Sequence, residues 1–144
     1  MSIKISIKMT TLNYEIKTHK IGRTYSKPHF YILNKGLNSG RPMNELCPNC
    51  FVVVTETNEQ RESLFYLSLS LQVGRYFNFY IKGSVIPFIT IDDTRKVLNN
   101  ALQNYKKDQW QLKVEKLKKI TLYDNNLKQQ LKTIGQLKLA LLRI

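Results

Sequence analysis

Alternation of polar and apolar residues near the start of the chain predicts two β-strands. Residues 2–8 place an isoleucine at every second position, and residues 11–17 continue the period with Leu12, Tyr14 and Ile16. A half-buried strand produces this pattern because successive side chains point to opposite faces of a sheet. We expect the two segments to pair as a hairpin.

Two apolar runs predict further strands, with a long loop between them. Residues 30–33 form a short run that ends at Asn34, and residues 51–55 are continuous and mostly β-branched, which is typical of a buried strand. The intervening segment 34–49 is punctuated by glycine, proline and asparagine and has no periodicity. Loops of this length inside a compact domain are often functional.

A buried helix is predicted after residues 51–55. Asn58 is the expected N-cap, and the carboxylate of Glu59 suits the positive end of a helix. Leucines at helical spacing then run from Leu64 to Leu71, and Gly74 is the expected end of the helix.

An extended segment and a helical region complete the chain. Residues 85–91 are predicted to be extended, and Pro87 places them at a sheet edge or a bulge. Asp92 or Asp93 is the expected cap of a helix whose apolar residues follow a 3.6-residue period. Residues 123–126 are the weakest helical point, so we expect one long helix or two.

These elements predict an α+β fold, in which a small mixed β-sheet domain with one buried helix precedes a C-terminal helical arm. We expect residues 1–91 to form the globular part and residues 92–144 the helical region. Within that region Leu127, Leu131 and Ile134 recur at a coiled-coil-like spacing. The arm is therefore expected to self-associate or dock onto a protein partner; packing on its own domain explains the spacing equally well.

A strong positive charge narrows the classes of partner. The formal net charge is +13, from 23 Lys and Arg against 10 Asp and Glu. Such a surface attracts polyanions over about 8–10 Å at ordinary salt. Nucleic acid is the first candidate, an anionic membrane surface the second and an acidic protein the third. A solvated basic surface that reflects a lysine-rich coding bias is the alternative.

Sequence features of membrane insertion and secretion are lacking. No stretch approaches the roughly 20 apolar residues of a membrane-spanning helix, and the N-terminal residues lack the apolar block of a signal peptide. We therefore expect no membrane span and a cytoplasmic location.

Basic and aromatic residues are interleaved just before the 34–49 loop and again in the segment 75–84, and Lys35 and Arg41 lie in the loop itself. Cations suit phosphates, and flat aromatic faces suit unstacked bases. The competing interpretation is that the aromatic residues are core and their basic neighbours ordinary surface. The candidate nucleic-acid-binding residues are Lys35, Arg41, Arg75, Tyr76, Tyr80 and Lys82.

Two cysteines have the spacing of half a zinc site. Cys47 and Cys50 enclose a Pro-Asn pair, and only His19 and His29 could complete four ligands. A strand rather than a helix follows the pair, which disfavours redox chemistry. We favour two small residues beside a turn, and so expect no cofactor, with zinc as the minor alternative.

Catalytic motifs are missing from the sequence. It contains no nucleophile elbow, P-loop, HExxH or dinucleotide-binding glycine motif. The few acidic residues fall mostly at predicted helix starts, where capping explains them. A non-enzymatic protein is therefore favoured over a small enzyme.

The order of these signals from residue 49 to 95 resembles the second half of the target-recognition domain in specificity subunits of type I restriction-modification systems. That family's Pro-Leu-Pro and Glu-Gln stretch before the long helix is absent here. The resemblance implies a stand-alone, DNA-binding recognition domain and a long helix that pairs with another. The matching pieces are Phe51-Val52-Val53, Leu64-Phe65-Tyr66-Leu67, Gly83-Ser84-Val85-Ile86-Pro87-Phe88-Ile89 and the helical region from Asp92.

The chain is also similar, at residues 33–40 and 47–52, to small uncharacterised proteins of gut Bacteroidota and of their phages and mobile elements. This similarity implies the cytoplasm of a bacterial host, or the virion if the chain is phage-encoded. Two functions are therefore expected. One is non-enzymatic DNA binding through the basic and aromatic loops. The other is a phage-encoded interaction protein, either a virion component or an anti-defence factor, that binds a protein partner.

Overall fold

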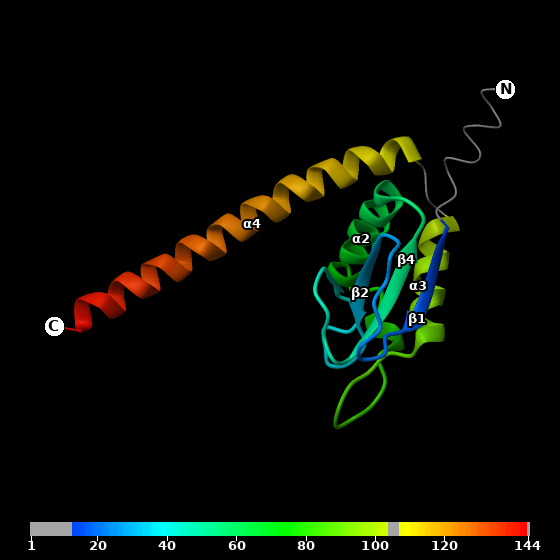
Figure 1. Cartoon of the computed structure of the whole chain (residues 1–144), viewed down its shortest axis with the longest axis horizontal. Coiled ribbons are helices and arrows are strands. Elements are labelled where there is room, and N and C mark those ends of the chain that lie inside the picture. The colour runs from blue at the N-terminus through cyan, green and yellow to red at the C-terminus, as the bar shows by residue number, and fades with distance from the viewer. Residues whose placement is uncertain (1–12, 104–106, 144) are drawn as a thin grey trace.

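The computed structural model describes residues 13–103 and 107–143. A sheet, two helices packed on it and a long projecting helix give an α+β fold, which confirms the predicted class (Figure 1). The expected strand over residues 2–8 lies outside the described residues. The elements are β1 (Tyr14–Thr18), β2 (His29–Leu33), β3 (Pro42–Met43), β4 (Cys50–Thr55), α2 (Asn58–Val73), the 3₁₀ helix η1 (Asn78–Tyr80), α3 (Ile91–Gln103) and α4 (Lys107–Leu142).

The four strands lie in the order β1-β4-β2-β3, and every pair is antiparallel. The described sheet is therefore not mixed as expected, because no helical crossover joins two of its strands. Val53 of β4 pairs with Ile16 on one side and with Phe30 on the other. This central position explains why β4 is the most continuous apolar run in the sequence.

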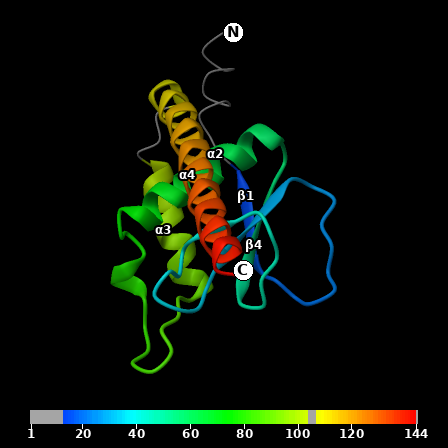
Figure 2. The ribbon, with the colours of Figure 1, turned by 90° about the vertical axis from the view of Figure 1, so that its left-hand side faces the viewer.

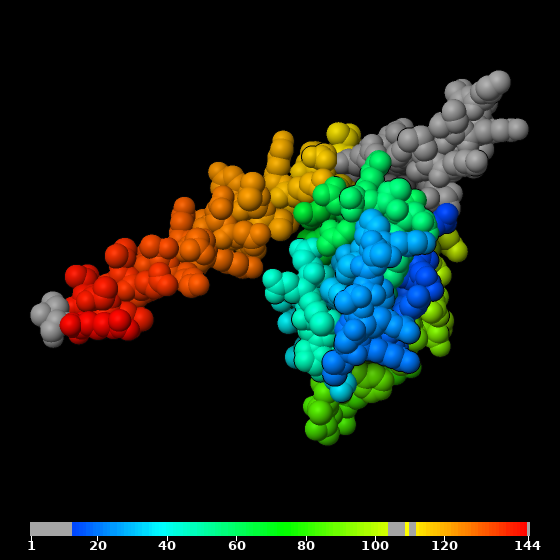
Figure 3. Space-filling model, in the orientation of Figure 1, coloured from blue at the N-terminus to red at the C-terminus, as the bar shows by residue number. Residues whose placement is uncertain are grey.

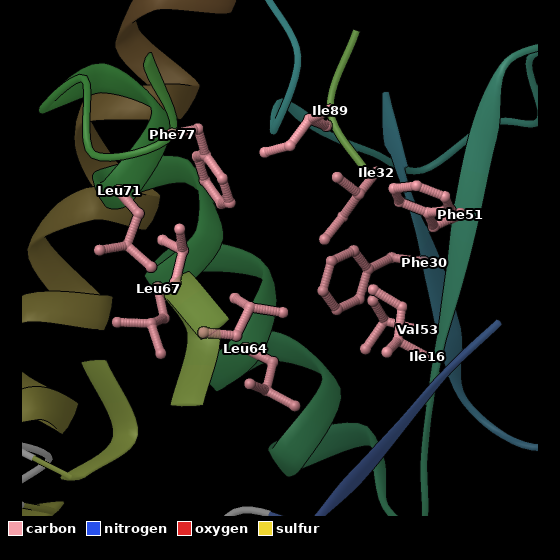
Figure 4. Packing of buried hydrophobic residues seen from close by; sticks show 12 residues of the cluster. Ile16, Phe30, Ile32, Phe51, Val53, Leu64, Leu67, Leu71, Phe77 and Ile89 are labelled. Atoms are coloured by element: carbon pink, nitrogen blue, oxygen red, sulfur yellow. The ribbon is translucent and has the colours of Figure 1, made fainter. Parts of the chain in front are cut away.

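One face of the sheet packs against α2 and α3, and the main core lies between these layers (Figure 4). The α3 helix contributes Val97 and Leu98 to this core. The core therefore extends beyond residue 91, where the sequence led us to end the globular part. The buried cluster comprises Ile16, Phe30, Ile32, Phe51, Val53, Leu64, Leu67, Leu71, Phe77, Ile89, Val97 and Leu98.

The starts of α2 and α3 differ from the predicted starts by small shifts. Thr57, not Asn58, caps α2, because its side chain accepts a hydrogen bond from the Gln60 amide at 3.1 Å. Thr90 similarly accepts from the Asp93 amide at 3.2 Å, so Asp93 lies in the first turn of α3 rather than capping it. Helix α2 ends before Gly74, as predicted.

The segment expected to be extended from residue 85 forms a loop instead. Lys82 and Phe88 exchange two backbone hydrogen bonds, each 2.8 Å long, and residues 83–87 turn between them. Gly83 has a φ of +94°, a conformation that glycine adopts without strain. The segment 82–88, which we call the tip loop, ends before the buried Ile89.

Helix α4 passes without interruption through residues 123–126, the predicted weakest helical point, where a separate terminal helix was one of the two expectations. Asp124 pairs with Lys128 one turn later at 2.9 Å, and such pairs offset the weak helix propensity of asparagine. The first turns of α4 contact α2 through the buried Val114 and the Lys118–Glu62 ion pair, which is 2.7 Å long. The helix then runs away from the body (Figures 1 and 2). No described helix has the length and apolar content to cross a membrane.

Candidate nucleic-acid interface

Two adjoining hollows lie beside the C-terminal end of α2. The tip hollow, about 670 Å³ in volume, lies between the 34–41 loop, the end of α2 and the tip loop. The arm hollow, about 870 Å³, lies between the 38–47 loop, α2 and α4, and Figure 3 shows the notch between α4 and the body. Asn38 and Gln72 line both hollows. The two hollows therefore form one continuous concave surface.

Phe77 fixes the loop that separates the hollows. Its side chain is fully buried, and a Cβ built on Gly40 would lie 2.3 Å from the Phe77 ring. Gly40 also has a φ of +98°, so the backbone contact with the ring depends on glycine.

Two backbone hydrogen bonds join the same loop to the base of the tip loop. The Gly36 amide donates to the Pro87 carbonyl at 2.7 Å, and the Ile89 amide donates to the Asn34 carbonyl at 3.0 Å. Segments about fifty residues apart in the sequence therefore share one rim.

Arg75, on the rim of the tip hollow, has an unusual backbone. Its φ is +64°, and it is the one described residue other than glycine with a positive φ. The Tyr76 amide donates to the Leu71 carbonyl at 2.9 Å, which is the closing bond of a Schellman helix end, where glycine is the usual left-handed residue. The left-handed conformation costs an arginine about 1 kcal/mol, and strain of this kind is concentrated at functional sites.

Three of the predicted binding residues present unpaired charges. The side chains of Lys35, Arg41 and Arg75 are exposed, and none of them takes part in an ion pair of the described residues. Arg41 lines the arm hollow and Arg75 the tip hollow, while Lys35 forms a β-bridge with Phe88 beside the tip hollow. The structure therefore brings these three cations to one end of the body.

Lys82 has a structural partner instead. Its ammonium lies 3.2 Å from the Asp93 carboxylate. Burial of Asp93 acts to raise its pKa, but hydrogen bonds from Lys82 and Thr90 outweigh this effect and hold the pKa below the usual value. This ion pair joins the tip loop to the first turn of α3.

The aromatic candidates also differ from one another. Tyr76 is 64% exposed. Tyr80 instead packs against the core and against the Phe79 ring, with the two ring centroids 5.0 Å apart. Phe79, which the sequence analysis did not select, is 86% exposed. The sequence offers a weak signal for Phe79, since it lies two positions after the buried Phe77 in a short turn and two such neighbours point in different directions.

The cysteines and histidines lie around the opposite face of the sheet. The rings of His19 and His29 each form a T-shaped contact with the Tyr31 ring, with ring centroids 5.5 Å apart in both cases. The Cys50 thiol donates to the Cys47 carbonyl at 3.0 Å, and burial raises its pKa. Among the described residues, no three potential ligands are grouped closely enough to hold a metal ion.

The two hollows differ in the charges that line them. Arg75 is the one charged residue among the described residues that line the tip hollow. The arm hollow is electrically mixed, because Glu45 and Asp124 lie there together with Arg41 and Lys128. The tip hollow is thus a basic surface rich in side-chain amides.

Fold and surface together define a small α+β protein with a basic concave end and a helical arm. The chain belongs to a family of unknown function (DUF6943), whose model matches residues 16–144. No curated protein matches the chain, and no solved structure matches it.

Proposed function

We propose that the protein binds DNA without catalysing a reaction, through the tip hollow and the neighbouring 34–41 loop. The observation that carries the proposal is Arg75, an arginine held in a left-handed conformation on the rim of a hollow without a carboxylate among its lining residues. A strained, unpaired cation suits a ligand with negative charge. The resemblance to target-recognition domains supports the same assignment.

The chemistry of the surface fits a nucleic acid. Lys35, Arg41 and Arg75 supply cations for phosphates. The side-chain amides of Asn38 and Gln72 both donate and accept hydrogen bonds, as recognition of base edges requires. The exposed rings of Tyr76 and Phe79 are available to stack on unpaired bases. We place this activity in the cytoplasm of a bacterial host.

Fluorescence anisotropy of a labelled DNA duplex, titrated with the full chain at several salt concentrations, tests the proposal. Three phosphate contacts predict that log K falls against log salt with a slope of about −2.7. Arg75→Gly should reduce both the affinity and the slope. Arg23→Ala is the matched control, because Arg23 is an exposed, unpaired cation on the β1–β2 loop.

Two results would refute DNA binding at this site. One is the absence of binding at low salt, or binding that is indifferent to salt. The other is an equal loss of affinity in the Arg75 and Arg23 variants, which would indicate attraction to net charge alone.

A protein partner at the tip loop is the second candidate. Val85 is 90% exposed and Ile86 is 64% exposed, and neighbouring exposed apolar side chains are typical of a docking surface. This arrangement favours an interaction protein, and the similarity to proteins of phages and mobile elements extends the candidate to a phage-encoded virion component or anti-defence factor. It predicts stable co-purification with a partner, loss of that partner on Val85→Ser with Ile86→Ser, and little affinity for free DNA.

A further inference from the structure

The outer part of α4 is an unpartnered amphipathic helix. Every side chain from Leu122 to Arg143 is exposed. Because α4 is continuous, its apolar positions form one uninterrupted face rather than two short ones. The exposed apolar residues on that face are Ile120, Tyr123, Leu127, Leu131, Ile134, Leu137 and Leu141.

This face has the repeat of a coiled coil. The d positions of successive heptads are Ile120, Leu127, Ile134 and Leu141, and each is aliphatic. The a positions are Leu117, Asp124, Leu131 and Lys138. The repeat extends over more than three heptads, the length at which such a pattern indicates a coiled coil.

The two charged a positions determine which orientation is favourable. A parallel pair of identical helices would place Asp124 against Asp124 and Lys138 against Lys138, with like charges inside the seam. An antiparallel pair brings Asp124 within one helical turn of the partner's Lys138 at both ends, because the two residues lie seven positions either side of Leu131. The helix is therefore complementary to a second copy of itself, as a two-fold interface requires.

The charge of the bodies favours the same arrangement. Each chain carries a net charge of +13. With the seam centred between Leu131 and Ile134, antiparallel arms place the two Val114 anchors about 55 Å apart along the helices, well beyond the 8–10 Å range of screened repulsion.

We infer that two copies of this chain pair through antiparallel α4 helices, with Leu131 and Ile134 at the centre of the seam and Asp124 facing the partner's Lys138. The inference does not rest on DNA binding, because the seam and the tip hollow use different residues. An apolar seam also persists at salt concentrations that dissociate a protein from DNA.

Analytical ultracentrifugation of the full chain, without DNA and at high salt, tests the pairing. We expect a species of twice 16.9 kDa that dissociates on dilution. Asp124→Lys alone and Lys138→Asp alone should each weaken the dimer about tenfold, since each places like charges together. The combined variant should restore pairing.

Lys132→Asp is the matched control, because it makes the same charge change as Lys138→Asp outside the seam. Circular dichroism of each variant verifies that α4 stays helical, since Asp124→Lys also removes the Asp124–Lys128 pair. A chain that remains monomeric at about 100 µM would overturn the inference. A dimer that neither single charge change weakens would also overturn it, as would a dimer that the combined variant fails to restore. If a different protein covers the arm, the isolated chain should remain monomeric.

Discussion

Gly40 lies against the buried ring of Phe77, and this contact fixes the position of the 34–41 loop. Gly40→Ala would bring a Cβ to 2.3 Å from the Phe77 ring at a φ of +98°. Overpacking and left-handed strain together should lower the free energy of unfolding by about 2–4 kcal/mol. Urea denaturation measures this loss.

Gly36→Ala is the matched comparison for that experiment. Gly36 has a φ of +92° but nothing within 4 Å of an added Cβ. It should therefore cost only the conformational strain, about 1–2 kcal/mol. Equal losses in the two variants would show that the Phe77 contact contributes little.

Arg75→Gly should separate stability from binding. Glycine relieves the left-handed strain, so the free energy of unfolding should stay unchanged or rise by up to about 1 kcal/mol while DNA affinity falls. Arg75→Ala removes the charge and keeps the strain, so it should lose affinity without gaining stability. Chemical denaturation beside anisotropy measures both quantities, and a clear loss of stability in Arg75→Gly would contradict the role of strain.

The Lys82–Asp93 pair predicts a pH dependence of stability. The folded state holds the pKa of Asp93 below its unfolded value. The stabilisation is therefore fully present above the unfolded pKa, near 4, and is lost as the pH falls through the folded pKa. Asp93→Asn should flatten the acid side of the stability profile between about pH 5 and pH 2.

Asp92→Asn provides the control within the same helical turn. The Asp92 side chain is 80% exposed and pairs with Arg95 at the surface, where such pairs contribute little. Its stability profile should follow that of the unchanged chain. Identical profiles for the two variants would remove the assigned role of Asp93.

Val114 should anchor the arm to the body. It is 6% exposed against α2, and its truncation to alanine leaves a small cavity. Val114→Ala should increase hydrogen exchange in the first turns of α4 and in α2, whereas Leu112→Ala, at a side chain that is 66% exposed, should not. Unchanged exchange in Val114→Ala would show that the Lys118–Glu62 pair is sufficient to hold the arm.

Local patterns predicted the elements better than their ends or their partners. The continuous apolar run of β4 and the leucine spacing of α2 indicated both elements. The spacing of apolar residues along the chain reflects which faces of a strand or helix are buried. Thr57 and Asn58 are both good caps, and the extended backbone of Thr57 decides between them. The weak local propensity near residue 125 did not reveal that α4 continues.

The candidate interface depends on contacts between distant residues, which no local pattern encodes. The sequence was sufficient to identify three cations in predicted loops as candidates, namely Lys35, Arg41 and Arg75. The partner of Lys82 was not, because Asp93 reaches it only through the packing of α3. Nor did a motif indicate that Gly40 meets Phe77, or that Asn38 and Gln72 join two hollows.

The uninterrupted course of α4 also has a mechanical consequence. A helix held by its first turns acts as a lever. Leu142 lies 28 residues beyond Val114, roughly 42 Å along the helix, so a tilt of roughly ten degrees at Val114 displaces the far end by about 7 Å. Small adjustments of α2 would thus be amplified along the arm and would move its far end relative to the body.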